Sequence, residues 1–216
     1  MLQTVIARIY EASLLSVAVF AVFRYRQADK STRYILFWIW LGLLTEVLGD
    51  ISIALFKTNM PVYALSCLLE FMILCGYFNQ SVRVLKAKNL GLFIGGLGTL
   101  LGILNICFLQ PLTVLNANFL FFECLVIVCL SLYALYRMLV EPGLKLWQET
   151  HFCFACLLIF YECVSLWNWG FYDYIIRSYP EKSAILNICL LTGNILTYAA
   201  CGLIIYLYPK MRQTHV

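Results

Sequence analysis

The chain has 216 residues, of which 63% are hydrophobic and only 12% are charged. This composition lies outside the range of soluble globular domains and predicts an integral membrane protein. The formal net charge of +4 comes from basic residues gathered between apolar stretches. It therefore reports orientation in a membrane, and we expect no nucleic-acid partner.

Seven apolar stretches are long enough to cross about 30 Å of hydrocarbon as helices, with short connections between them. The first stretch contains Arg8 and Glu11, and no small-residue cleavage site follows it. We therefore interpret it as a retained helix and not as a signal peptide. The expected fold is all-α, a single polytopic domain over residues 1–216. Its transmembrane helices are predicted near residues 3–23, 34–56, 61–82, 90–109, 115–136, 149–172 and 183–208.

Basic residues mark one side of the predicted bundle. Eleven lie after the first, third and fifth helices or in the C-terminal tail, and three lie on the opposite side. The positive-inside rule then predicts the N-terminus outside and the C-terminus inside. The eleven basic residues are Arg24, Arg26, Lys30, Arg33, Arg83, Lys86, Lys88, Arg137, Lys145, Lys210 and Arg212. The aromatic residues Tyr34, Trp38 and Trp40 are also expected at the inner interface.

Six carboxylic acids lie inside the apolar stretches. Each costs about 2.5–3.5 kcal/mol at such a position on insertion scales, which marks these residues as candidate functional sites. At a rise of about 1.5 Å per residue, all six fall at a similar depth, roughly 9–15 Å below the outer ends of their helices. Two asparagines seven residues apart on one face of the last helix lie in the same layer. The predicted ligand- or cation-binding residues are Glu11, Glu46, Asp50, Glu70, Glu123, Glu162, Asn187 and Asn194.

Positive charge is scarce near these acids. Only Arg8, one turn from Glu11, lies close by in the sequence. At least four acids therefore need protons or a bound cation to balance them. The alternative is that each acid only forms hydrogen bonds between helices, which contribute well under about 1 kcal/mol apiece. The shared depth of all six favours a binding layer.

The helices before and after residues 90–109 show a similar order of features. Successive acids are 35 and 24 residues apart in the first set, and the matching positions are 39 and 25 residues apart in the second. The pattern predicts a 3+1+3 arrangement of two parallel repeats, which many transporters use. The matching positions are Glu11, Glu46 and Glu70 in the first set and Glu123, Glu162 and Asn187 in the second.

The stretch 90–109 differs from the others because it is uncharged and rich in glycine. Small residues allow helix backbones to approach closely. The glycines predict either a dimerisation face, which would make the protein a homo-oligomer, or tight packing inside the bundle, and we favour packing. They are Gly91, Gly95, Gly96, Gly98 and Gly102, with two G-x-x-x-G spacings.

Metal and catalytic motifs are sparse. Cys153 and Cys156 form a C-x-x-C pair, but no second pair accompanies them, so we interpret them as apolar filling. The two histidines, His151 and His215, lie on the predicted inner side, far from the acid layer. We expect no metal site and no cofactor. No nucleophile elbow, Walker or dinucleotide motif is present.

Several short segments resemble known families. LLTEVLG at 43–49, PVY at 61–63, LEF at 69–71 and GN at 193–194 resemble a group of small uncharacterised seven-helix membrane proteins of Bacteroidota. This resemblance covers nearly the whole chain and implies a multi-pass protein of the bacterial inner membrane, but no activity. The string Leu48-Gly49-Asp50 is similar to the region of the first acid in bacterial lysoplasmalogenases.

We expect a non-enzymatic membrane protein with an acid-lined pocket open to the outer side. It would sense a cation or a small polar, basic ligand and pass a helix movement to a cytoplasmic signalling partner. One alternative is a proton- or cation-coupled small-molecule transporter. Another is a lysoplasmalogenase-like hydrolase in which Asp50 and Glu162 act as paired acids. The inner halves of the helices hold mainly Leu, Val and Phe, which favours sensing over transport.

Overall fold

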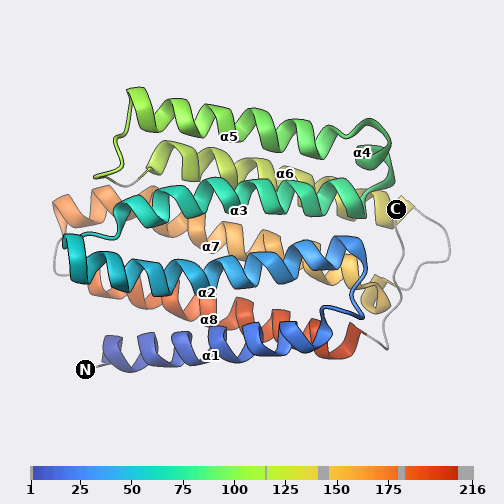
Figure 1. Cartoon of the computed structure of the whole chain (residues 1–216), viewed down its shortest axis with the longest axis horizontal. Helices are drawn as coiled ribbons and strands as arrows, with labels where there is room; N and C mark the ends of the chain where they lie inside the picture. The colour runs from blue at the N-terminus through green and yellow to red at the C-terminus, as the bar shows by residue number, and fades with distance from the viewer. Residues whose placement is uncertain (1, 115, 141–145, 180–182, 209–216) are drawn as a thin grey trace.

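The computed structural model describes residues 2–114, 116–140, 146–179 and 183–208 as a bundle of antiparallel helices (Figure 1). Seven of its helices are long and apolar enough to cross a membrane, which indicates a multi-pass membrane protein. The predicted all-α bundle with seven membrane-length helices is confirmed. These helices are α1 (Leu2–Arg24), α2 (Lys30–Phe56), α3 (Met60–Ser81), α5 (Leu90–Phe108), α6 (Ala117–Val140), α7 (Thr150–Ser178) and α8 (Ser183–Leu207), and the short elements are α4 (Arg83–Lys88) and the 3-10 helix η1 (Leu146–Gln148).

Successive long helices run in opposite directions, so the bundle has two ends (Figure 1). We call the end where α1 begins the N-side; the α2–α3, α5–α6 and α7–α8 connections also lie there. The other end, where α8 finishes and α4 lies, is the C-side.

Two helices are at least four residues longer than the sequence predicted. α2 begins at Lys30 because Asp29 caps it: the Asp29 Oδ1 atom accepts a hydrogen bond of 2.9 Å from the Thr32 N–H. Residues 30–33, interpreted as a loop, are therefore helical. α7 continues to Ser178 and ends just before Tyr179, the residue that precedes a proline in the sequence.

The helices close into a ring. α1, α2, α3, α6, α7 and α8 pack in that order, and α8 returns to pack against α1. α5 lies outside the ring, against α3 and α6 (Figure 1). The ring interior contains polar residues toward the N-side and a dense apolar core toward the C-side.

The glycines of α5 explain its close approach to the ring. A Cβ atom at Gly98 would collide with the Phe71 ring of α3, and one at Gly102 would collide with Leu68. Gly91 and Gly95 also face α3, whereas Gly96 has no neighbour within 4 Å. The packing interpretation is confirmed for four of the five glycines.

Candidate functional site

A cavity of about 670 Å³ lies inside the ring, in its N-side half. Its lining includes Gln3, Met60 and Ala184, in the first turns of helices that begin at the N-side, so the cavity reaches that end. It extends along α8 to Tyr198, roughly 20 Å further by helical rise. The volume is typical of small-molecule sites, which span roughly 300–1,000 Å³.

The cavity brings together most of the residues predicted from the sequence. Asp50 is the exception, because its side chain is exposed and is not part of the lining. Asp50 lies one turn nearer the N-side end of α2 than Glu46, and its side chain is exposed there. The predicted residues that do line the cavity are Glu11, Glu46, Glu70, Glu123, Glu162, Asn187 and Asn194.

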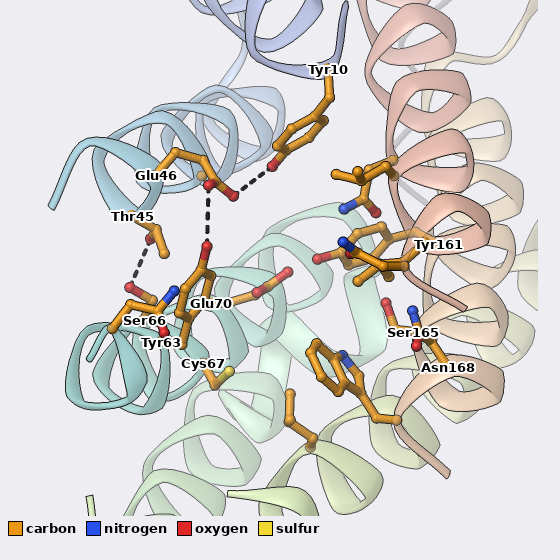
Figure 2. Close-up of a pocket in the computed structure, with 18 of the residues that line it drawn as sticks. Tyr10, Thr45, Glu46, Tyr63, Ser66, Cys67, Glu70, Tyr161, Ser165 and Asn168 are labelled. Carbon is orange, nitrogen blue, oxygen red and sulfur yellow. Dashed lines mark hydrogen bonds between the residues drawn. The ribbon is translucent and has the colours of Figure 1, made fainter. Parts of the chain in front are cut away.

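Glu46 forms the first acidic subsite, held by two tyrosines. The Tyr10 hydroxyl donates to its Oε1 atom at 2.9 Å, and the Tyr63 hydroxyl donates to its Oε2 atom at 3.1 Å. Figure 2 shows Glu46 between these two rings. The bonds link α1, α2 and α3 at the cavity wall. Both carboxyl oxygens of Glu46 are therefore satisfied within the protein.

Glu70, Glu123 and Glu162 form a second acidic subsite, contributed by α3, α6 and α7. The Trp38 indole N–H donates to the Glu70 Oε1 atom at 2.7 Å, and Tyr161 also hydrogen-bonds Glu70. Glu123 and Glu162 are only 3% and 2% exposed. Neither carboxyl oxygen of Glu123 has a hydrogen-bond partner, and Oε1 of Glu162 also has none.

These oxygens without a protein partner are energetically unfavourable. A buried polar group without a partner costs about 1–3 kcal/mol. Glu123 lies close enough to both Glu70 and Glu162 for their charges to interact. The second subsite therefore presents acceptor oxygens that a bound donor would satisfy.

Positive charge is scarce at the cavity, as the sequence predicted. Arg8 pairs with Glu11 at 2.7 Å in an exposed contact. Among the described residues, the other cavity acids have no ion-pair partner within 4.0 Å, and no Lys, Arg or His belongs to the lining. In that same part of the chain, no three His, Cys, Asp or Glu side chains are placed to hold one metal ion.

An aromatic wall joins the two acidic subsites. Its members are Tyr10, Tyr198, Trp38 and Tyr161, all in the cavity lining. Ring centroids are 6.0 Å apart for Tyr10 and Tyr198, 5.9 Å for Tyr198 and Trp38, and 5.1 Å for Trp38 and Tyr161. Trp38, which the sequence predicted at the inner interface, faces the interior of the bundle, and its side chain is 2% exposed. Aromatic faces attract cations.

Polar residues that the sequence analysis missed complete the lining. Ser165 and Asn168 follow Glu162 on one face of α7, at spacings of three residues (Figure 2). Helical periodicity alone could have found them. Thr45 and Ser66 share a hydrogen bond of 2.7 Å between α2 and α3. These two residues lie on different helices, so no local sequence pattern connects them.

A second polar cluster lies at the C-side, outside the cavity. The Tyr208 hydroxyl donates to the Asp29 Oδ1 atom at 3.1 Å and accepts from the Asp29 N–H at 2.8 Å. The His151 Nε2 atom lies 3.7 Å from Asp29 Oδ2, and its Nδ1 atom lies 3.4 Å from the Tyr77 hydroxyl. Ser31 contacts both Asp29 and His151. We call these five residues the C-side cluster; they connect α2, α3, α7 and the end of α8.

The charge of Asp29 stabilises this cluster. Burial raises the pKa of Asp29, but the nearby His151 ring and the hydrogen bonds from Ser31 and Thr32 outweigh burial and hold the pKa well below its usual range. A carboxyl group with a lowered pKa contributes stability above its unfolded-state pKa of about 3.9 and loses that contribution as the pH falls further.

Replacing Asp29 by alanine is therefore expected to lower the free energy of unfolding by about 0.5–2 kcal/mol at neutral pH, through loss of the helix cap. The deficit should shrink as the pH falls below about 4, because the unfolded wild-type chain then takes up a proton on Asp29 that the folded protein does not. Thermal unfolding in detergent at both pH values measures this. Asp29→Asn keeps a good cap without the charge and should fall between the two. Equal stability of wild type and Asp29→Ala at neutral pH would contradict the role of the cluster.

Comparisons with protein-family models, curated proteins and solved structures found no match for this chain. The chemistry of the cavity must therefore carry the functional argument. The cavity offers carboxyl oxygens, hydroxyls and aromatic faces, and the described lining contains no basic side chain. Such a surface is suited to a ligand that donates hydrogen bonds and carries positive charge.

Proposed function

We propose that this protein is a membrane receptor that binds a small basic organic molecule in the N-side cavity. The observation that carries the proposal is the carboxyl group of Glu123, which is buried, without a hydrogen-bond partner and adjacent to two further acids. An ammonium group placed there would form charge-assisted hydrogen bonds with acids that have no other counter-charge. A single metal ion suits the cavity less well, because no described set of three side chains is placed to hold one.

The proposed receptor has its N-side outside the cell and its C-side in the cytoplasm of a bacterium, in the inner membrane. The described basic residues support this orientation, since Arg24, Arg33, Lys86 and Arg137 lie toward the C-side, while Lys57 lies at the N-side. The proposed parallel repeat pairs α1–α3 with α6–α8. It is consistent with matching helix directions in the two sets (Figure 1).

Binding is proposed to move helices that reach the cytoplasmic side, where a signalling partner would respond. Four helices connect the cavity to the C-side cluster. α2 carries Glu46 and Ser31. α3 carries Glu70 and Tyr77, α7 carries Glu162 and His151, and α8 leads from Tyr198 to the end that precedes Tyr208. A shift of any of them at the cavity would therefore act on the cluster.

An apolar core separates the cavity from the C-side and favours sensing over transport. Ala21, Ile35, Leu74, Phe154 and Ile205 come from five helices, lie on the C-side of the acids, and are at most 1% exposed. A transporter would need a second conformation in which this core opens. The hydrolase alternative is weakened, because exposed Asp50 does not share the cavity with Glu162.

The proposal is tested with butylamine as ligand and butanol, its uncharged counterpart, as control. We expect butylamine to raise the thermal stability of the purified protein in detergent in a saturable manner, by about 2.7 kcal/mol at one hundred times its Kd. Butanol should have no such effect. Glu123→Gln preserves shape but cannot ionise, and it should reduce the butylamine effect.

Asp50→Asn serves as the matched control, because it removes an exposed acid outside the cavity and should leave the effect of butylamine intact. Stabilisation by butylamine that is equal in wild type and Glu123→Gln, or that butanol reproduces, would contradict binding through the cavity acids.

A further inference from the structure

We propose that the cavity recognises an elongated aliphatic diamine or polyamine, with one ammonium group at Glu46 and another at the subsite of Glu70, Glu123 and Glu162. This inference rests on the proposed function and adds the ligand class. It is carried by two acidic subsites within one cavity and by the aromatic wall between them.

The two acidic subsites are electrostatically distinct. The acids that act most strongly on Glu46 are Asp50 and Glu11, toward the N-side. Those that act on Glu123 are Glu70 and Glu162. Tyr198 lies between the subsites, because its ring neighbours both Tyr10, which holds Glu46, and Trp38, which holds Glu70. One ammonium group is too small to satisfy both subsites at once.

The subsites also differ in what they lack. Glu46 already accepts a hydrogen bond on each oxygen, so an ammonium group there would add charge compensation to a formed site. Glu123 accepts none, so an ammonium group there would supply its missing hydrogen bonds. A ligand with two separated ammonium groups would serve both needs.

The aromatic wall suits the methylene chain of such a ligand. Its rings follow one another from Tyr10, which holds Glu46, to Trp38 and Tyr161, which hold Glu70. The Trp38 and Tyr198 rings are stacked, with an angle of 27° between their planes. Alkyl carbons pack well on ring faces, and the same faces attract the adjacent ammonium groups.

Isothermal titration of the full chain in detergent tests this with diamines and monoamines of equal chain length. The pairs are putrescine with butylamine, cadaverine with pentylamine, and hexamethylenediamine with hexylamine; spermidine extends the series. At the best chain length, the diamine should bind about tenfold more tightly than its monoamine, because it adds a charge-assisted hydrogen-bonding group. This comparison needs no variant, so folding defects cannot obscure it.

Variants then test which acid binds each end of the diamine. Glu46→Gln and Glu123→Gln should each reduce diamine affinity about tenfold, to the monoamine level, while Gly96→Leu, on the open face of α5, leaves it unchanged. Equal affinities for the diamine and its monoamine in wild type would overturn the two-subsite inference while leaving the proposed receptor standing. Absence of binding by every amine in wild type would overturn the proposed function as well.

Discussion

Replacing Glu123 by leucine is expected to stabilise the protein by about 1–3 kcal/mol and to weaken amine binding. The carboxyl group is buried, and neither oxygen has a hydrogen-bond partner. Removing an unsatisfied buried polar group recovers its desolvation cost, and an apolar side chain of similar size can fill its place. A substitution that raises stability and weakens binding indicates that the original residue serves function rather than folding. Thermal unfolding in detergent, paired with calorimetric titration of butylamine, measures both effects.

Glu46 provides the matched control for this prediction. Its oxygens accept hydrogen bonds from Tyr10 and Tyr63, so Glu46→Leu leaves two hydroxyl groups without a partner and should destabilise the protein. Opposite signs for the two leucine variants are therefore expected. Destabilisation by Glu123→Leu as large as that by Glu46→Leu would mean that Glu123 serves the packing of the bundle rather than a ligand.

Replacing Gly98 by leucine is expected to destabilise the protein by about 1–3 kcal/mol or more, because the new side chain must enter the space of the Phe71 ring. Gly96→Leu is the control on the same helix. A Cβ atom at Gly96 meets nothing within 4 Å, so this variant should change stability by no more than about 0.5 kcal/mol.

Thermal unfolding of the two variants, at matched protein concentrations, measures the difference. The pair also distinguishes packing within the bundle from self-association through α5. If Gly96→Leu were the more damaging variant and its effect depended on protein concentration, the exposed face of α5 would be a contact between copies of the chain.

The sequence predicted the helices well, and it singled out acids that line the cavity, because both depend on local composition. A long apolar stretch must form a helix in a bilayer, since its backbone has no other hydrogen-bond partners there. Glu46, Glu70, Glu123 and Glu162 were selected because acids in such stretches are costly. The cavity lining contains all four. What they bind stays a prediction.

Other features depend on how the helices turn and pack, which composition does not report. Asp50 was grouped with Glu46 on spacing, but it lies one turn nearer the N-side end of α2, where its side chain is exposed. Trp38 was assigned to an interface on its distance from a helix end, yet it faces the interior and binds Glu70. The C-side cluster joins Asp29, His151 and Tyr208, which no local pattern connects.

The most direct test of the central claim is a structure determined with saturating hexamethylenediamine. The account predicts elongated density along the aromatic wall, with one nitrogen within hydrogen-bonding distance of Glu46 and the other within hydrogen-bonding distance of Glu123. Density in which only one nitrogen is held, at either Glu46 or Glu123, would support an amine receptor with a single subsite. A cavity filled by a lipid or detergent chain, with the amine absent, would contradict the account.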